Sequence, residues 1–279
     1  MSTVTITAAD INKLRQATGA GMMDCRKALT ETNGDFEAAI DWLRKQGQKV
    51  AAKRSDREAK EGVIIAKTSA DNKTGFIVCI SCETDFVSKN ADFVAFAQSI
   101  ANAAVENDVK SAEELNEVLI GGAKVADMIN DKLAAIGEKI GVAKFERLEA
   151  PYVASYIHGA NRMGVLVGLS SESAEAGKDI AMQIAAMNPV AVDADSVPAE
   201  TVERERAIII DTMKEDPKMA GKPEDMIAKI AEGKLNAFFK EQTLLAQAFV
   251  KDGGMSVADY LKSAGADLKV TGFKRVALG

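Results

Sequence analysis

One β-β-α pattern occurs twice in this sequence, and it restricts the possible folds more than any other feature. In each copy, two short runs of β-forming residues flank a polar turn, which is typical of a hairpin, and the hairpins span 63–80 and 152–169. They align without a gap, so Gly75 corresponds to Gly164. A helical pattern follows each hairpin, with apolar faces formed by Phe93, Phe96, Ile100 and Ala104 in the first copy and by Ile180, Ile184 and Met187 in the second. The repeat predicts two similar lobes and an α+β fold.

The two copies differ between the second strand and the helix, where the first copy is longer by about five residues. The surplus falls around residues 85–89, and Thr84-Asp85-Phe86-Val87 sets two apolar residues on this connecting loop. Apolar side chains that are exposed on a loop usually need a partner, so these four residues form a candidate partner-binding segment. The alternative is that Phe86 folds back over its own sheet, and the residues alone favour neither.

The first fifty residues carry three helical patterns separated by turn signals. Thr7 is placed to cap the first helix, Met22 opens the second, and Asp35 caps the third. Three helices in so short a stretch bury little area, so we expect residues 1–50 to form a small docking domain. The flexible thioethers of Met22 and Met23 suit contact with a partner surface, and a core position for one of them is the alternative.

The rest of the chain divides by composition. A basic stretch at 51–61 predicts a linker, and the alternative is that the basic residues within 44–60 form a docking strip for an acidic partner. The two copies then place one core lobe at 62–148 and the other at 149–279. Between the hairpins we expect a helical stretch at 112–139.

The second lobe contains a predicted helical hairpin at 198–240. Its first helix is broken at Pro217, and Pro223 begins the second. A projecting hairpin with apolar seams is often an arm for self-association, and the alternative is that it packs on its own lobes. A short helix at 257–263 and a final strand at 270–278 are expected to follow.

Few residues are arranged for covalent chemistry. Cys79 and Cys82 have the C-x-x-C spacing of redox and zinc sites, but odd spacing within a strand directs the two side chains to opposite faces. Zinc needs four ligands, and only Cys25 and His158 remain in the chain. His158, at the turn of the second hairpin, is better suited to contact a partner. We expect no metal, no cofactor and no enzymatic activity, and an enzyme using the cysteine pair is the main rival.

Charge and hydropathy limit the partners further. The formal net charge is −6 at pH 7, whereas a dedicated nucleic-acid-binding protein needs a basic surface. No apolar run approaches the roughly 20 residues that span a bilayer, and residues 1–10 lack the pattern of a secretory signal. The three cysteines form an odd, sparse set that fits a reducing compartment. These features predict a cytoplasmic protein with no direct nucleic-acid or membrane partner.

Four motifs in order resemble the elongation factor Ts family over nearly the whole chain. They are residues 18–25 with Lys27-Ala28-Leu29, residues 82–87, His158-Gly159-Ala160 and Gly164-Val165-Leu166-Val167. The resemblance implies a guanine-nucleotide exchange factor that binds elongation factor Tu, both GDP-bound and nucleotide-free, and promotes GDP release during translation elongation. A plain adaptor that binds without altering its partner is the second rival. The family also implies a ubiquitin-associated-like N-terminal bundle, a two-lobed core, and a coiled-coil hairpin that forms a homodimer.

The resemblance further implies roles for single residues. The segment similar to Thr84-Asp85-Phe86-Val87 wedges beside the magnesium site of elongation factor Tu, with Phe86 as the apolar wedge and Asp85 perturbing the surroundings of the ion. His158 supports the same displacement. Arg15, Met22 and Met23 match positions by which the N-terminal domain docks on the nucleotide domain. Some members continue past the motif at 270–273 into a C-terminal helical module, so with an end at Gly279 we expect binding to depend more on the N-terminal bundle.

Overall fold

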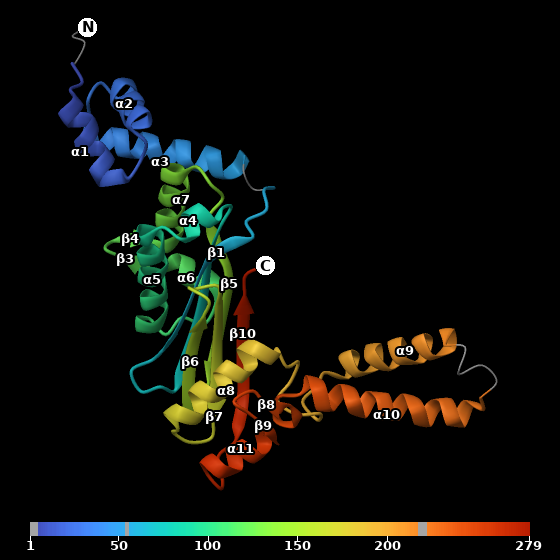
Figure 1. Ribbon diagram of the computed structural model, residues 1–279. Coiled ribbons are helices and arrows are strands. Elements are labelled where there is room, and N and C mark those ends of the chain that lie inside the picture. Colours follow the sequence, from blue (N-terminus) through green and yellow to red (C-terminus); the bar gives the residue numbers. More distant parts are fainter. Residues whose placement is uncertain (1–4, 54–55, 217–221) are drawn as a thin grey trace.

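The computed structural model describes residues 5–53, 56–216 and 222–279 (Figure 1). The N-terminal bundle consists of α1 (Ala8–Thr18), α2 (Met22–Glu31) and α3 (Phe36–Lys53). The predicted caps are confirmed: Thr7 Oγ1 accepts a hydrogen bond from Asp10 N at 3.2 Å, and Asp35 Oδ1 accepts one from Ala38 N at 2.9 Å. Helix α3 continues to Lys53, three residues into the segment predicted to be a linker.

Each hairpin copy forms a three-stranded antiparallel sheet. The first lobe contains β1 (Glu61–Thr68), β2 (Thr74–Cys82), α4 (Asp85–Ser88), α5 (Ala91–Glu106), α6 (Ala112–Glu117), β3 (Leu119–Ile120), β4 (Ala123–Lys124), α7 (Val125–Ile136) and β5 (Gly141–Glu149). The second contains β6 (Tyr152–His158), β7 (Met163–Leu169), α8 (Ala174–Met187), η2 (Leu244–Ala246), β8 (Ala248–Phe249), β9 (Asp252–Ser256), α11 (Val257–Ala264) and β10 (Val270–Ala277). The strand orders are β1-β2-β5 and β6-β7-β10. The α+β class and both hairpins are confirmed.

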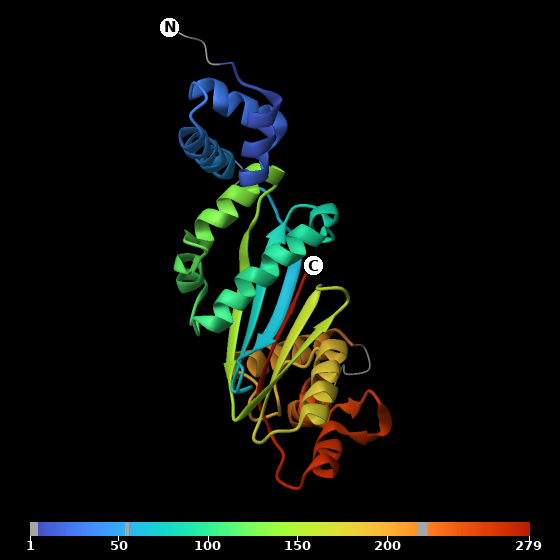
Figure 2. The ribbon, with the colours of Figure 1, turned by 90° about the vertical axis from the view of Figure 1, so that its left-hand side faces the viewer.

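The two sheets pack face to face, and their helices lie on the outer faces (Figure 2). An apolar cluster fills the space between the sheets, formed by Ile64, Ile77, Cys79, Val153, Leu166 and Val276. A Cβ on Gly75 would lie 2.7 Å from Leu166 and Val153. A Cβ on Gly164 would lie 2.8 Å from Ile64, which occupies in the first copy the position of Val153 in the second. The two aligned glycines therefore permit the same close approach from opposite sides.

Backbone hydrogen bonds between the sheets repeat this symmetry. Ile64 N donates to Asn161 O at 2.8 Å, and Val153 N donates to Asn72 O at 2.6 Å. The two asparagines occupy equivalent hairpin turns with φ of 67° and 54°, a left-handed conformation that asparagine tolerates better than most residues. Each hairpin turn thus anchors the first strand of the other copy, and the duplication sets how the lobes assemble.

Two features of the core differ from the sequence predictions. The helical stretch expected at 112–139 is interrupted by the small β3–β4 hairpin, because Gly121 and Gly122 adopt φ of 60° and 88°. Strand β5 was not predicted, although it pairs with β2 as β10 pairs with β7. On α8, Ile180 and Ile184 are buried as expected, but Met187 is exposed at the end of the helix.

The predicted helical hairpin is present and projects from the second lobe (Figure 1). It consists of α9 (Ala199–Glu215) and α10 (Glu224–Gln242), and the predicted break at Pro217 lies outside the described residues. Its apolar seam, with Ile209, Met213, Ala231 and Leu235 buried, forms between its own two helices. No helix within the described ranges is both long enough and apolar enough to cross a membrane.

Candidate functional site

The segment that distinguishes the two copies forms a short helix at one end of the core. Residues 83–90 connect β2 to α5, whereas 170–173 suffice between β7 and α8. The sequence predicts a loop, but residues 85–88 make the single turn α4, in which Lys89 N donates to Asp85 O at 3.0 Å. This turn gives the segment a defined backbone.

Helix α4 divides its two apolar residues between solvent and core. Phe86 is 85% exposed, so the alternative in which it covers its own sheet is wrong. Val87 instead packs against the core cluster beneath α5. One side chain thus anchors the turn while the other projects from it. An exposed phenylalanine on an anchored turn is the arrangement expected of a contact residue.

The start of α4 is held by Glu138, a residue that the sequence analysis missed. One Glu138 oxygen accepts hydrogen bonds from Glu83 N and Thr84 N, both at 3.0 Å, and the other accepts from Thr84 Oγ1 at 2.6 Å. In return, the Glu83 carboxylate accepts from Lys139 N at 2.7 Å. The segments 83–84 and 138–139 are therefore tied in both directions. No local pattern marks Glu138, because it lies within the helical stretch expected at 112–139 and meets Thr84 only in the fold, where α7 ends at Ile136.

Asp85 begins α4 and forms an ion pair with Lys89, with Oδ2 2.6 Å from Nζ. The hydrogen bond and charge of Lys89 hold the pKa of the Asp85 carboxyl below its usual value. Asp85 therefore stays anionic beside the projecting phenylalanine. This places a negative charge and an apolar ring within one turn.

The predicted docking residues of the N-terminal bundle are on its surface. Met22 and Met23, at the start of α2, are 52% and 71% exposed, so neither has the core position considered as an alternative. Arg15 is exposed on α1. Cys25, by contrast, is fully buried in the bundle core. The surface methionines are therefore available for contact.

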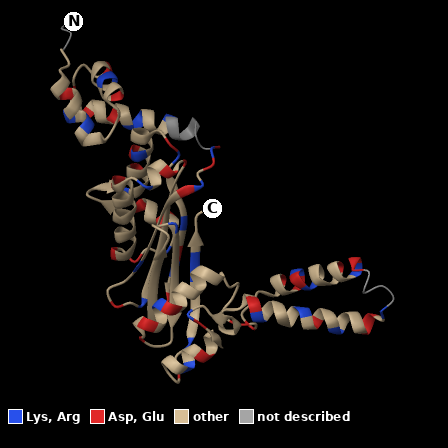
Figure 3. Cartoon of the chain, in the orientation of Figure 1, with Lys and Arg blue, Asp and Glu red and all other residues tan. Residues whose placement is uncertain are grey.

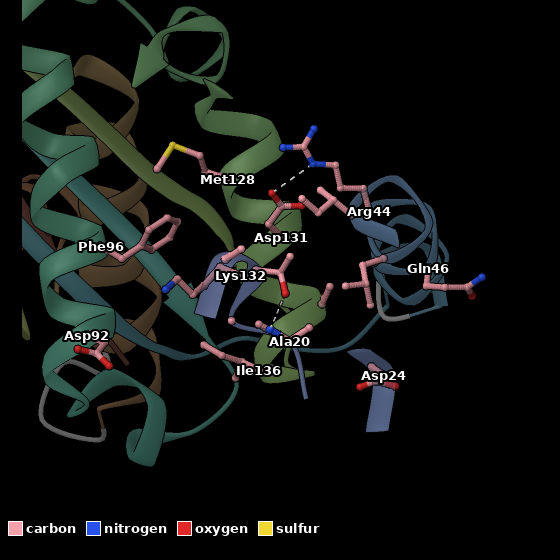
Figure 4. A pocket seen from close by; sticks show the side chains of 18 of the residues that line it. Ala20, Asp24, Arg44, Gln46, Asp92, Phe96, Met128, Asp131, Lys132 and Ile136 are labelled. Carbon is pink, nitrogen blue, oxygen red and sulfur yellow. Dashed lines mark hydrogen bonds and ion pairs between the residues drawn. The ribbon is translucent and has the colours of Figure 1, made fainter. Parts of the chain in front are cut away.

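A cleft of about 910 Å³ lies between the bundle and the core (Figure 4). The bundle meets the core where α3 crosses α7: a Cβ on Gly47 would lie 2.7 Å from the Cβ of Ala134, and Arg44 forms an ion pair with Asp131 at 3.6 Å. Burial at this contact raises the pKa of the Asp131 carboxyl. Phe86 and Val87 line the core side of the cleft. The bundle and α4 thus border the same recess.

His158 lies exposed at the end of β6, with Nδ1 3.0 Å from the Tyr156 hydroxyl. The turn that follows it reaches the first sheet, because Arg162 forms an ion pair with Glu61 at 2.7 Å. Glu61 pairs with Cys82, immediately before the segment that contains Phe86. The fold therefore brings the turn after His158 to the same end of the core as α4, although about seventy residues of sequence separate them.

The cysteine pair has the geometry expected of core residues. Cys79 packs between the two sheets, and Cys82 packs under the outer helices, so the prediction of opposite faces is confirmed. Burial raises the pKa of Cys79 to about 11 and that of Cys82 to about 12. A redox or nucleophilic thiol needs the opposite shift. Within 5–53, 56–216 and 222–279, no three His, Cys, Asp or Glu side chains gather closely enough to hold a metal ion.

The stretch between bundle and core carries acidic as well as basic residues (Figure 3), and ion pairs within the chain neutralise part of its positive charge. Arg57 forms an ion pair with Glu83 at 3.0 Å, and Lys60 forms one with Glu58 at 2.7 Å. Together with Arg44 and Asp131, these pairs involve three of the cations that could have formed a docking strip. The ion pairs favour the connecting role over the strip.

Comparison with known proteins gives one consistent family. The family model described as elongation factor TS matches residues 83–279. The elongation factor Ts of Christiangramia forsetii is 50% identical over 277 residues, which cover 98% of this chain and 99% of that protein. That of Flavobacterium psychrophilum is 50% identical over 278 residues, covering 99% of each chain. That of Porphyromonas gingivalis is 44% identical over 277 residues, covering 98% of each.

Proposed function

We propose that this chain promotes GDP release by pushing Phe86 against the magnesium site of its partner. The chain belongs to the elongation factor Ts family, and it therefore acts as the nucleotide exchange factor of elongation factor Tu in translation elongation. The observation that carries the proposal is the 85% exposure of Phe86 on the anchored turn α4. An unpartnered ring held in this way gains most of its burial when a partner covers it.

The adjacent charge completes the mechanism. Magnesium bridges the phosphates of a bound nucleotide and is the largest local charge in such a site. The ring of Phe86 displaces the backbone around the ion, and the Asp85 carboxylate competes for its water and hydrogen-bond shell. Loss of the ion weakens GDP binding. Because the coupling is reciprocal, GDP weakens the binding of this chain by the same factor.

The chain itself makes and breaks no covalent bond in this mechanism, which requires neither a cofactor nor a metal of its own. The same chain binds elongation factor Tu in its GDP-bound and nucleotide-free states, in the cytoplasm. The raised pKa values of the buried thiols support this non-enzymatic mechanism over the rival that uses a cysteine pair.

The test is stopped-flow release of a fluorescent GDP from elongation factor Tu. We expect Asp85→Ala and Phe86→Ala together to leave the fold intact and to reduce catalysed release sharply. Leu119→Ala is a matched control, since Leu119 is also a large exposed apolar residue of the first lobe. Release by the double variant at the parent rate, under conditions where binding is saturated, would refute the wedge mechanism.

We further propose that Arg15, Met22, Met23 and His158 dock the chain on its partner. The N-terminal bundle, of the ubiquitin-associated-like type that the family implies, contributes the first three. Replacing both methionines with alanine should raise the dissociation constant and leave the release rate at saturation unchanged. A loss of the saturated rate would instead place these residues in the exchange step. A plain adaptor predicts that the parent chain binds tightly and leaves GDP release unaltered.

The projecting hairpin of α9 and α10 is proposed as an arm for a homodimer. Exposed apolar side chains on both helices, Ile208 and Met226, support this role because its own seam leaves them uncovered. Deletion of residues 200–239 should yield a monomer in light scattering. A deletion product that stays dimeric would reject the arm as the site of association.

A further inference from the structure

Two arginines occupy equivalent positions in the duplicated sheets. Arg147 of β5 is in register with Phe76 of β2, and Arg275 of β10 is in register with Val165 of β7. The hairpin alignment makes Phe76 and Val165 equivalent, so the two arginines correspond. In both, Nε is buried and has no hydrogen-bond partner within the described part of the chain. The fold thus places a partly buried guanidinium on the third strand of each lobe.

Arg147 is neutralised within its own lobe. Its Nη2 lies 2.7 Å from the Asp108 carboxylate, and its Nη1 lies 2.5 Å from the Glu149 carboxylate. The guanidinium lies over the Phe76 ring, 5.8 Å from its centroid, and its side chain is only 16% exposed. Two carboxylates and one aromatic face therefore satisfy the charge of the first copy.

Arg275 has lost this arrangement. Where the first copy has Glu149 opposite Thr74, the second has Ala277 opposite Met163. Among residues 5–53, 56–216 and 222–279, no carboxylate lies within 4.0 Å of the Arg275 guanidinium nitrogens. Arg275 is half-buried, and burial lowers its pKa. A partly buried cation without a counter-charge is unfavourable in the free chain, and an incoming carboxylate would relieve it.

The face that carries Arg275 also carries His158. Across the second sheet, Arg275, Val165 and Tyr156 form one register row. The next row on the same face is formed by Ala277, Met163 and His158. Cross-strand partners and residues two apart along a strand point to the same side of a sheet. The unpaired guanidinium is therefore continuous with the residue proposed to dock the second lobe.

We propose that Arg275 binds a carboxylate side chain of elongation factor Tu and extends the docking surface of the second lobe beyond His158. The inference rests on the proposed function for its partner, but not on the wedge mechanism. A planar guanidinium that has lost its internal carboxylates offers two parallel donors to one from outside. The pair of acids around Arg147 shows, within the same chain, the chemistry that this position accepts.

The decisive variant is Arg275→Met, which keeps an unbranched apolar side chain and removes the charge. We expect its dissociation constant for elongation factor Tu to rise roughly tenfold to a hundredfold, the range for a charged hydrogen bond lost at an interface. The affinity should also become less sensitive to salt. The melting temperature of the free variant should stay equal to that of the parent or rise, because no internal ion pair is broken.

Arg147→Met is the matched control, and it should behave in the opposite way. It leaves Asp108 and Glu149 without their guanidinium, so its melting temperature should fall while binding stays at the parent value. Arg275→Lys, which retains the charge, should keep part of the affinity that the methionine variant loses. Parent-like binding by Arg275→Met would overturn the proposal, as would a fall in its melting temperature equal to that of Arg147→Met. Either result would leave the GDP-release test of Phe86 unaffected.

Discussion

Replacing Glu138 with alanine should slow GDP release without preventing the chain from docking. Glu138 accepts three hydrogen bonds that orient the start of α4, at 3.0, 3.0 and 2.6 Å. A hydrogen bond to a charged group contributes about 1.5–3 kcal/mol when it is buried. Here the site is half-buried, and water can replace the carboxylate in the variant, so we assign about 2 kcal/mol to the three together. That energy lowers the ratio of oriented to non-oriented segment roughly 30-fold, so the release rate at saturation should fall by up to that factor.

The assay is stopped-flow release of fluorescent GDP at saturating concentrations of each variant, combined with a double-mutant cycle. Glu138 touches no partner in this mechanism and acts through the position of Phe86. Its effect should therefore largely disappear in a Phe86→Ala background. Glu138→Gln keeps one carbonyl acceptor and should lose less than alanine. Glu117→Ala is the control, because it removes an exposed carboxylate of the same lobe that is paired with Lys124.

Two results would refute this reasoning. Release by Glu138→Ala at the parent rate would mean that the three hydrogen bonds do not hold the segment in its active position. A loss of the same size with and without Phe86 would mean that Glu138 acts independently of the wedge. A lowered melting temperature alone would not account for a loss that depends on Phe86, so the cycle separates positioning from general destabilisation.

Substitutions at the sheet interface and at the buried thiols test the fold. Gly75→Ala and Gly164→Ala should each lower the free energy of unfolding in urea by about 1–3 kcal/mol, since the added methyl meets the opposite sheet. Gly233→Ala, on a face of α10 with open space in the described structure, should instead raise it by up to about 1 kcal/mol. Burial raises the thiol pKa of Cys79 from 9.0 to about 11 and that of Cys82 to about 12, so their stabilising contribution is complete below pH 9. Between pH 9 and 11 the parent should lose up to about 1.4 kcal/mol per thiol and pH unit, and Cys79→Ala with Cys82→Ala should flatten that slope. Unchanged GDP release by this double variant would remove support from a redox role. If the free energy of unfolding fell equally steeply with pH in the parent and the variant, the burial argument would be contradicted.

Local signals predicted most of the elements. The capping residues Thr7 and Asp35 could be predicted from the sequence, because an N-cap needs only a side-chain oxygen and a backbone N–H a few residues away. Alternation and turn residues located both hairpins for the same reason. Strand β5 was missed because exposed charged residues, Lys144 and Glu149, interrupt its apolar pattern. Strands at the edge of a sheet carry weaker patterns than central ones.

Parts of the candidate site depended on contacts that no local pattern records. Thr84 forms a hydrogen bond with Glu138, which lies fifty-four residues later in the chain. Gly47 has no side chain, and this allows α3 to pack closely against α7. The exposure of Phe86 was likewise undecided in the sequence, since a phenylalanine in a connection fits either a core or a contact role. The fold decided it by giving the core anchor to Val87.

Duplication gives each lobe a reference for judging the other. Residues that hold the two sheets together are the same in both copies. They are the aligned glycines, which leave room for the opposite sheet, and the asparagines of the hairpin turns, which accept hydrogen bonds from the other sheet. The two clearest departures are each unfavourable in the isolated chain. The longer connection carrying Phe86 orders additional residues and exposes an aromatic ring, and the surroundings of Arg275 omit the carboxylates that its counterpart has. Neither departure improves the free fold, which supports the proposals that Phe86 and Arg275 each contact a bound partner.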